Sequence, residues 1–550
     1  MYTLGINAAF HDSSASIIND GQLLAAVEEE RFTHVKHGKR PIPFSTYELP
    51  YHAIDYCLQT ARIDLRDVDH IAYSFNPSLF RGYNKSLLDQ LFISMIQDAP
   101  GHLADGFPHH LQKRFMNATK DSSQWHFVDH HIAHAASAFL PSPFEEAAVM
   151  TLDGRGERTT TSYYYGDRNN LGMLANVEMP HSLGLLYERI TTYLGFLHSS
   201  DEYKVMALAS YGEPTCARKL RSHIHLHGDG TYTIDDFDFA EVFGPIRHRG
   251  EPFVKRHYDI ASSLQKVLEE IVLELSGWLQ KKSSAENLCL AGGVALNCVL
   301  NAAIRDNNIF KDIWVQPAAG DAGTSLGAAL WIDRQQSRGE KFTMSHAYWG
   351  PAYGDSEVED FLKWTKVPYR KLNDIPAETA AILANNKVIG WYQGRMEFGP
   401  RALGSRSILA SPIHADMQSK LNDIKDREDF RPVAPVVLEE DAGEWFDNAE
   451  FSPFMLFVYK VKDEKKDLIP AVRHVDGTAR IQTINAQQHP QYYNLLKEFK
   501  KLTGVPVLVN TSFNTRGEPI VCTPRDAVEC FWTSPLDALV IGSYLLEKQR

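Results

Sequence analysis

A pattern of strand, tight turn and hairpin occurs twice in the chain, and it restricts the fold more than any other feature. The first copy covers residues 3–27 and contains Asn19-Asp20-Gly21 between its last two apolar runs. The second copy covers residues 147–177, with a polar turn at 166–170. A turn such as Asp-Gly between apolar runs is a strong hairpin signal. The repeat predicts an α/β domain made of two related halves.

The duplicated pattern resembles the superfamily of sugar kinases, Hsp70 and actin, which hold a nucleotide between their two halves. Helical periodicity at residues 47–59, 86–97, 183–194 and 260–279 predicts helices that cover the two sheets. We therefore expect an N-terminal domain of this actin/Hsp70/sugar-kinase-like class.

A second domain is expected after a polar stretch that contains glycine and proline, residues 335–353. A chain of 550 residues is too long for a single core. Strands are predicted at 388–392, 505–509 and 537–546. These observations place the boundary at residues 345/346, with domains 1–345 and 346–550.

Composition narrows the partners and the compartment. The net charge of −13 disfavours a nucleic-acid surface, which would be basic. Met1 leads directly into an apolar strand and no run of about 18 apolar residues occurs, so neither a signal peptide nor a membrane helix is predicted. The six cysteines form no Cys-x-x-Cys pair and indicate reduced thiols. We expect a cytoplasmic enzyme with no nucleic-acid or membrane partner.

Two histidines and two aspartates form a candidate metal site. His130 and His134 are four residues apart in a predicted helix, so both imidazoles lie on one face. Asp153 and Asp321 each follow an apolar strand and precede a glycine-containing turn. Two nitrogens and two oxygens would suit Fe, Mn or Zn. The alternative is a chance helical pair in a chain with 23 histidines.

Three turns are candidates for binding a nucleotide. Gly292 and Gly293 follow a predicted strand and precede a helix, where backbone amides can approach an anion. The Gly320–Gly323 turn would form the second edge of the same cleft, and His11–Ser14 would supply a phosphate loop from the other half. The alternative is that these glycines only allow tight packing.

A cluster of basic residues lies in the second domain. Guanidinium groups bind phosphate oxygens through two parallel hydrogen bonds. Acidic residues are interleaved with the cluster, so a salt-bridged surface is the alternative. The cluster consists of Arg395, Arg401, Arg406, Lys425, Arg427 and Arg431, joined by Arg480.

The motifs in their order resemble a known family. The segments Phe-His-Asp-Ser-Ser-Ala, His-His-x-x-His, Gly-Gly-Val-Ala-Leu-Asn and Gly-Asp-Ala-Gly resemble the transferase that makes threonylcarbamoyladenosine in tRNA. With residues 28–33, 203–206 and 510–514, nearly the whole chain resembles the NodU/CmcH carbamoyltransferase family. The resemblance implies a TsaD-like N-terminal domain and an α+β YrdC-like C-terminal domain.

The family's activity implies substrates and cofactors for this chain. Carbamoyl phosphate and ATP, with Mg²⁺, would form a carbamoyl-adenylate. The carbamoyl group would then pass to a hydroxyl of a small-molecule acceptor, such as an antibiotic or another natural product. The acceptor pocket is expected in the stretches 82–110 and 213–255, which carry no recognised motif.

The resemblance also implies roles for particular residues. It makes His130, His134, Asp153 and Asp321 ligands of Fe²⁺, and places His11 and Lys36 at the transfer site, with His11 as a candidate base. An exposed His or Lys is otherwise usually a solvated surface group. The family's nucleotide or carbamoyl-adenylate site corresponds to Asp12, Ser13, Glu188, Gly292, Gly293, Asn297 and Gly320. The site for carbamoyl phosphate and ATP corresponds to Arg401, Lys425, Arg431, Arg480, Asn510 and Ser512. The lysine-arginine signature of YrdC relatives is not evident in this sequence.

Two other functions are alternatives to carbamoyl transfer to a small molecule. A regulatory or chaperone-like ATPase of the same superfamily would have no need of the basic cluster or the Asn510–Asn514 segment. A tRNA-modifying enzyme is disfavoured by the net charge of −13.

Overall fold

The computed structural model describes residues 1–38, 49–80, 115, 123–168, 170–337, 339–515 and 517–548. The chain divides into two compact units, Met1–Met344 and Ser345–Arg550, which are described separately here. The helix predicted at 86–97 and the acceptor stretch at 82–110 lie outside the described residues.

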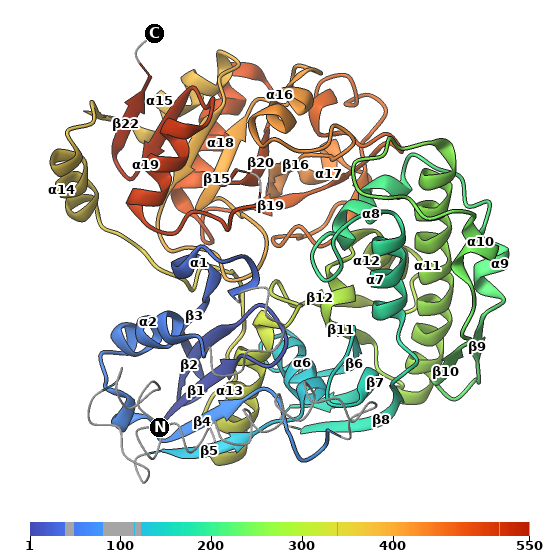
Figure 1. Ribbon diagram of the computed structural model, residues 1–550. Coiled ribbons are helices and arrows are strands. Elements are labelled where there is room, and N and C mark those ends of the chain that lie inside the picture. The colour runs from blue at the N-terminus through green and yellow to red at the C-terminus, as the bar shows by residue number, and fades with distance from the viewer. Residues whose placement is uncertain are drawn as a thin grey trace. The chain divides into compact units, whose positions relative to one another are not determined.

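Unit 1 contains two five-stranded sheets with the same topology (Figure 1). Numbered along the chain within its own half, each sheet has the order 3-2-1-4-5. The first three strands of each half are antiparallel neighbours, and the last two run parallel to the first. The predicted duplication is therefore confirmed. The strands are β1 Tyr2–Asn7, β2 Ser14–Asn19, β3 Gln22–Glu28, β4 His70–Tyr73 and β5 Gln124–Phe127, then β6 Glu146–Leu152, β7 Thr159–Asp167, β8 Asn170–Glu178, β11 Asn287–Ala291 and β12 Asp312–Val315.

Two helices in equivalent positions pack crosswise between the halves. Helix α6 (His130–Phe139) follows β5, yet it packs on β6 and β11 of the second sheet. Helix α13 (Ala322–Gln336) follows β12 and packs on β1, β2 and β4 of the first sheet. The two helices also pack on each other, as Figure 1 shows. A Cβ at Gly327 would lie 1.8 Å from the Ala133 carbonyl oxygen, so only glycine allows this approach.

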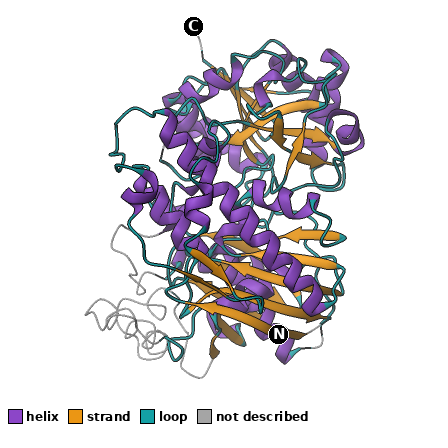
Figure 2. Ribbon diagram, turned by 90° about the vertical axis from the view of Figure 1, so that its right-hand side faces the viewer, coloured by secondary structure: helices purple, strands orange, loops and turns teal. Residues whose placement is uncertain are grey.

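The other elements of unit 1 cover the outer faces of the sheets. Helix α2 packs on β2 and β3, and the long α11 packs on β6 and β7 together with α7, α8, α9 and α12 (Figures 1 and 2). The expected acceptor stretch 213–255 forms α9, α10 and a small hairpin. Their bounds are α1 Glu30–Thr33, α2 Tyr51–Ala61, α7 Leu183–Tyr193, α8 Glu202–Ala209, α9 Ala217–Arg221, β9 Ile224–Leu226, β10 Tyr232–Ile234, α10 Phe239–Phe243, α11 Lys255–Ser283 and α12 Cys298–Asp306.

Unit 2 is built on one eight-stranded mixed sheet in the order β13-β22-β21-β14-β15-β20-β16-β19, with a separate β17-β18 pair. Helices along the sheet complete an α+β unit (Figure 2). The strands are β13 Arg370–Lys371, β14 Ile389–Tyr392, β15 Arg406–Ala410, β16 Ala434–Leu438, β17 Val458–Lys460, β18 Thr478–Arg480, β19 Gln482–Ile484, β20 Val507–Ser512, β21 Ala538–Ile541 and β22 Tyr544–Glu547. The helices are α14 Asp355–Thr365, α15 Ile375–Ala384, α16 Met417–Ile424, α17 Ala442–Trp445, α18 Pro490–Thr503 and α19 Pro524–Thr533.

Some element bounds differ from those predicted. The single strand expected at 537–546 is the hairpin β21–β22, because Gly542 has φ +53° and reverses the chain. The five-residue turn at 166–170 is shorter, since Asp167 pairs with Asn170. Strand β1 ends at Asn7, before the predicted Ala9. Strand β20 extends to Ser512 and so carries Asn510 and Ser512 within the sheet.

Among the described residues, no helix has the length and the apolar character needed to cross a membrane.

A buried histidine should make unit 2 sensitive to acid. His489 is 9% exposed, and its Nδ1 accepts the Tyr492 amide at the start of α18. Burial lowers the pKa of His489 to about 4. The unfolded chain therefore binds the proton more tightly, and stability present above pH 6.5 is lost as the pH falls towards 4, by about 3 kcal/mol at most. His489→Asn keeps a helix-capping residue but does not titrate, and should reduce the acid-induced fall in melting temperature. The exposed His414→Asn should leave that fall unchanged.

Candidate functional site

The four predicted metal ligands meet inside unit 1. His130 Nε2 lies 3.2 Å from His134 Nε2, and each is 3.6 Å from Asp321 Oδ1. Asp153 Oδ2 lies 3.9 Å from His130 Nε2. All four side chains are buried, and one ligand atom from each lies within 4.8 Å of the others. This spacing fits one ion held by two imidazoles and two carboxylates.

The surroundings orient the two imidazoles for this role. His130 Nδ1 lies 3.1 Å from the Ser74 carbonyl oxygen, so it is the nitrogen that carries the proton. The lone pair of His130 is thereby left on Nε2, which faces the cluster. The charges of Asp321 and Asp153 outweigh burial and raise the pKa of His130 to about 9. The same carboxylates would favour a divalent cation between them.

Glu157 holds the start of α6 in place, and sequence reasoning did not single it out. Its carboxylate accepts the backbone amides of His130 at 3.0 Å and of Asn76 at 2.6 Å. Burial raises the pKa of Glu157 to about 8. The residue belongs to the same loop as Asp153, so it ties that loop to the helix that carries both histidines. In the sequence, the signal for this role is only that Glu157 is an acidic residue four positions after Asp153.

The predicted strand-end position of Asp321 was wrong. Strand β12 ends at Val315, and Asp321 is the N-cap residue of α13. Asp153 does follow its strand directly, because β6 ends at Leu152. His130, Asp321 and the other candidate ligands therefore lie near the N-termini of α6 and α13, the two helices that pack crosswise between the halves.

The glycine pair after β11 lies next to Asp153, one of the four candidate metal ligands. Gly293 donates its amide to Asp153 Oδ1 at 2.8 Å, so this amide is engaged by a carboxylate of the protein. A Cβ at Gly292, where φ is +91°, would lie 2.2 Å from the Leu152 carbonyl oxygen. The close-packing alternative therefore accounts for Gly292, while Gly293 positions the Asp153 carboxylate.

A chain of hydrogen bonds that begins at His11 lies beside the four candidate metal ligands. His11 Nε2 is 4.0 Å from Asp321 Oδ2, and His11 Nδ1 is 3.0 Å from Asp12 Oδ2. The second Asp12 oxygen is 2.7 Å from Nδ1 of His37, which sequence reasoning missed. Burial is outweighed by the charges of Asp321 and Asp12, which raise the pKa of His11 to about 10. Lys36, half exposed, pairs with Glu30 at 3.2 Å.

The remaining predicted nucleotide residues lie in three different places. Gly320 lies near the His11 turn, because a Cβ there would be 4.0 Å from Asp12 Oδ2, and Ser13 donates to the Gly38 carbonyl. Glu188 lies beside the Asp153 loop, 3.8 Å from Arg155. The Asn297 side chain caps α12 and bonds to Gln265, which commits it to local structure.

In unit 2, Lys425 and Ser512 are brought together with Asn514. Lys425 Nζ donates to Ser512 Oγ at 3.2 Å and to Asn514 Oδ1 at 2.6 Å. Burial, together with the charges of Arg427 and Arg431, holds the pKa of Lys425 well below its usual value. This concentration of positive charge around a buried lysine suits a phosphate ligand.

The other predicted phosphate residues occupy different surroundings. Arg401 lies in the loop between β14 and β15, and Asn510 Nδ2 donates to the next residue's carbonyl, that of Ala402, at 3.2 Å. Arg480 ends β18 and shares no hydrogen bond or ion pair with the other five, all of which are described. Arg406, buried over the Tyr392 ring, donates to backbone carbonyls and has a structural role.

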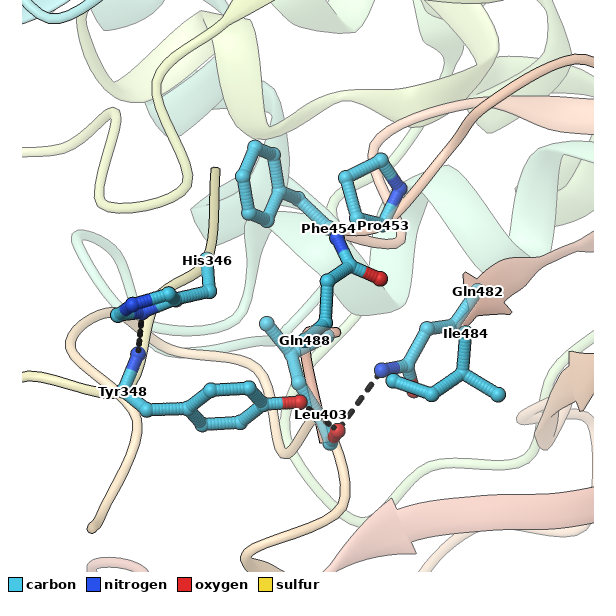
Figure 3. Close-up of a pocket in the computed structure, with 9 residues that line it drawn as sticks. His346, Tyr348, Leu403, Pro453, Phe454, Gln482, Ile484 and Gln488 are labelled. Atoms are coloured by element: carbon cyan, nitrogen blue, oxygen red, sulfur yellow. Dashed lines mark hydrogen bonds between the residues drawn. The ribbon is translucent and has the colours of Figure 1, made fainter. Parts of the chain in front are cut away.

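A small pocket lies beside the loop that carries Arg401, and Leu403 of that loop lines it (Figure 3). It is lined by His346, Ala347, Tyr348, Leu403, Pro453, Phe454, Gln482, Ile484 and Gln488. About 190 Å³ of empty space, its mouth included, is below the roughly 300–1,000 Å³ of typical ligand sites. The pocket is therefore too small for ATP.

Comparison with known proteins places this arrangement in a family. Residues 2–330 match the model of the carbamoyltransferase N-terminus and residues 380–548 that of the carbamoyltransferase C-terminus. The chain belongs to the carbamoyltransferase family, whose members are enzymes.

Three relatives are matched over most or all of this chain. An uncharacterized protein of Synechocystis sp. is 41% identical and is matched over 100% of this chain and 97% of its own length. Nodulation protein NolNO of Sinorhizobium fredii is 40% identical, over 99% of this chain and 80% of its own. Nodulation protein NolO of Bradyrhizobium diazoefficiens is 41% identical, over 77% and 79%.

Proposed function

We propose that this carbamoyltransferase is an ATP-dependent O-carbamoyltransferase that works in two half-reactions. In the first, water cleaves carbamoyl phosphate to carbamate and phosphate, and carbamate attacks the α-phosphorus of ATP, which gives carbamoyl-adenylate and pyrophosphate. In the second, an acceptor hydroxyl attacks the carbamoyl carbon and expels AMP. The observation that carries the proposal is that a buried set of metal-ligating residues lies in unit 1, while a buried lysine, Lys425, lies in unit 2 close to the charges of Arg427 and Arg431.

Unit 2 is assigned the first half-reaction. Lys425 and Arg431 would neutralise phosphate charge, and Arg401 would bind a second phosphate group through its guanidinium fork. The Ser512 hydroxyl donates to Asn514 Oδ1 at 2.7 Å and accepts from Lys425, so Ser512 would act by holding Lys425 beside the phosphate. Mg²⁺ would accompany ATP, as in other phosphoryl transfers. Asn510 is assigned a different part, because its two amide hydrogens are donated to Ala402 O of the Arg401 loop and to Gln482 Oε1.

Unit 1 is assigned the second half-reaction. His130, His134, Asp153 and Asp321 would hold Fe²⁺, with Mn or Zn as chemically acceptable alternatives. The bound ion would supply Lewis-acid polarisation at the carbamoyl group. His11, held by Asp12, directs Nε2 towards the same place. It would act as the base for the acceptor hydroxyl, because a cation held by Asp321 would offset the charge that raises the pKa of His11. The acceptor is proposed to be a small hydroxyl-bearing natural product.

The alternative of a regulatory ATPase makes a different prediction for isotope exchange. Wild-type protein with ATP and labelled pyrophosphate should form labelled ATP only when carbamoyl phosphate is present. Exchange without carbamoyl phosphate, or none with it under conditions where the protein consumes ATP, would contradict the proposed first half-reaction.

His37 should affect transfer without affecting adenylate formation. In His37→Ala, Asp12 loses its 2.7 Å partner and His11 is held less firmly. Transfer from carbamoyl-adenylate should fall about tenfold or more, a part of the 10²–10⁴ that an acid–base group contributes. Pyrophosphate exchange and metal content should stay at wild-type levels. His52→Ala is the control, because His52 pairs with a carboxylate outside this site, Glu29 at 2.6 Å. An effect as large as that of His37→Ala would mean that the loss of any such pair in unit 1 impairs transfer.

A further inference from the structure

The loop that carries Arg401 is fastened to the sheet beneath it by a continuous set of hydrogen bonds. Side chains from three strands donate to three consecutive carbonyl oxygens of the loop. Asn510 on β20 donates to Ala402 O at 3.2 Å, Gln482 on β19 to Leu403 O at 2.7 Å, and Trp391 on β14 to Gly404 O at 2.7 Å. The backbone immediately after Arg401 is therefore fixed at every carbonyl from 402 to 404.

The amides of the same loop are fixed by one carboxylate. Glu397 Oε1 accepts from Leu403 N at 2.7 Å, Ser405 N at 2.8 Å and Arg406 N at 3.3 Å. Glu397 is 2% exposed, so water does not compete for these bonds. The Tyr348 hydroxyl adds a second donor to Leu403 O at 2.8 Å, and Figure 3 shows Tyr348 and Gln482 beside Leu403.

Gln482 connects Leu403 of the loop with Asn510 on β20. Its Nε2 must donate to Leu403, because a carbonyl oxygen only accepts. Its Oε1 therefore faces Asn510 Nδ2, 2.8 Å away, and accepts from it. The orientation of both amides follows from the loop carbonyls, so Asn510 has no amide hydrogen left over for a phosphate oxygen.

We infer that Gln482, Asn510 and Glu397 are positioning residues that hold the Arg401 guanidinium in its phosphate-binding place. This inference rests on the proposed first half-reaction. The family resemblance implies a direct phosphate contact for Asn510, whereas its two amide hydrogens are donated to Ala402 O and to Gln482 Oε1. A displacement of about 1 Å at a charged binding group can cost about a hundredfold in rate, so a fixed loop has a clear chemical use.

The test is Gln482→Glu, which keeps the shape and the acceptor towards Asn510 but removes the donor to Leu403. The matched control is Gln488→Glu, which lines the same pocket and bonds to Ser345 O, outside the loop. Hydrogen exchange should become faster at the amides of residues 403–406 in Gln482→Glu only. Unchanged exchange there would overturn the inference whatever the activity, so this measurement stands apart from the proposed function.

Activity supplies the second measurement, on wild-type protein that shows pyrophosphate exchange. Gln482→Glu should weaken that exchange about tenfold to a hundredfold, mainly through a higher KM for carbamoyl phosphate or ATP. In an Arg401→Ala background, the same substitution should have little further effect, because Gln482 acts through Arg401. Additive losses would show a general structural role and would overturn the inference. Wild-type protein without exchange would count against the proposed function, while the amide measurement would still decide the anchoring.

Discussion

Asp321→Ala should lose the bound transition metal and with it the transfer of the carbamoyl group. Asp321 Oδ1 is 3.6 Å from both histidine Nε2 atoms, so it is the carboxylate common to both. Removing it takes away one of two anionic ligands and leaves His130 and His134 without a shared counter-charge. Loss of a residue that merely supports a ligand costs about 10- to 100-fold in metal affinity, and loss of a ligand should cost at least as much.

Metal content by mass spectrometry and transfer from preformed carbamoyl-adenylate measure the two effects separately. Asp333→Asn is the matched control, since Asp333 is a buried aspartate on the same helix that bonds to Ser337. Pyrophosphate exchange in unit 2 should persist in both variants. Wild-type protein that takes up no transition metal, or an Asp321→Ala variant that transfers normally, would contradict the metal assignment.

Arg431→Ala should have the opposite effect: adenylate formation in unit 2 should fall, while metal content and transfer from preformed carbamoyl-adenylate in unit 1 should persist. If Arg431 binds a phosphate group, its removal eliminates a charge-assisted hydrogen bond worth about 1.5–3 kcal/mol. This corresponds to a loss of about tenfold to a hundredfold in adenylate formation. Arg431→Lys should recover only part of the loss, because an ammonium group cannot reproduce the two parallel bonds of a guanidinium.

Preformed carbamoyl-adenylate should restore transfer in Arg431→Ala but not in His130→Ala, because only the latter damages unit 1. Arg525→Ala is the control within unit 2, since Arg525 is an exposed arginine with a weak contact to Glu529 at 4.0 Å. Rescue of both variants, or of neither, in protein shown to be folded would mean that the two half-reactions are not divided between the units.

The sequence predicted the duplicated fold because its signals are local. Hairpin turns and alternating apolar residues mark both copies, and the helix that begins at His130 has its N-cap at Asp129. His130, His134, Asp153 and Asp321 lie together in unit 1, and their role as metal ligands stays a prediction.

The supporting residues could not be predicted, because their roles depend on contacts between distant segments. Glu157 is recognisable only once its loop meets the start of α6, and His37 only once its ring reaches Asp12. The donor direction of Asn510 is set by Gln482 and the loop carbonyls, none of which is adjacent in sequence. Hydrogen-bond direction is a property of the assembled network, and a motif specifies only the residue type.

The crosswise packing of α6 and α13 also determines when unit 1 can fold during synthesis. Strand β1 is translated first, but α13, which covers its sheet, is completed only at residue 336. At about 5–20 residues per second, the ribosome needs roughly 15 to 60 s to make the intervening segment. For that time, the part of the first sheet that α13 covers lacks this helix, although α2 can already pack on β2 and β3. We expect the nascent protein to depend on a chaperone, and a truncation that ends before α13 to aggregate instead of yielding a folded first half.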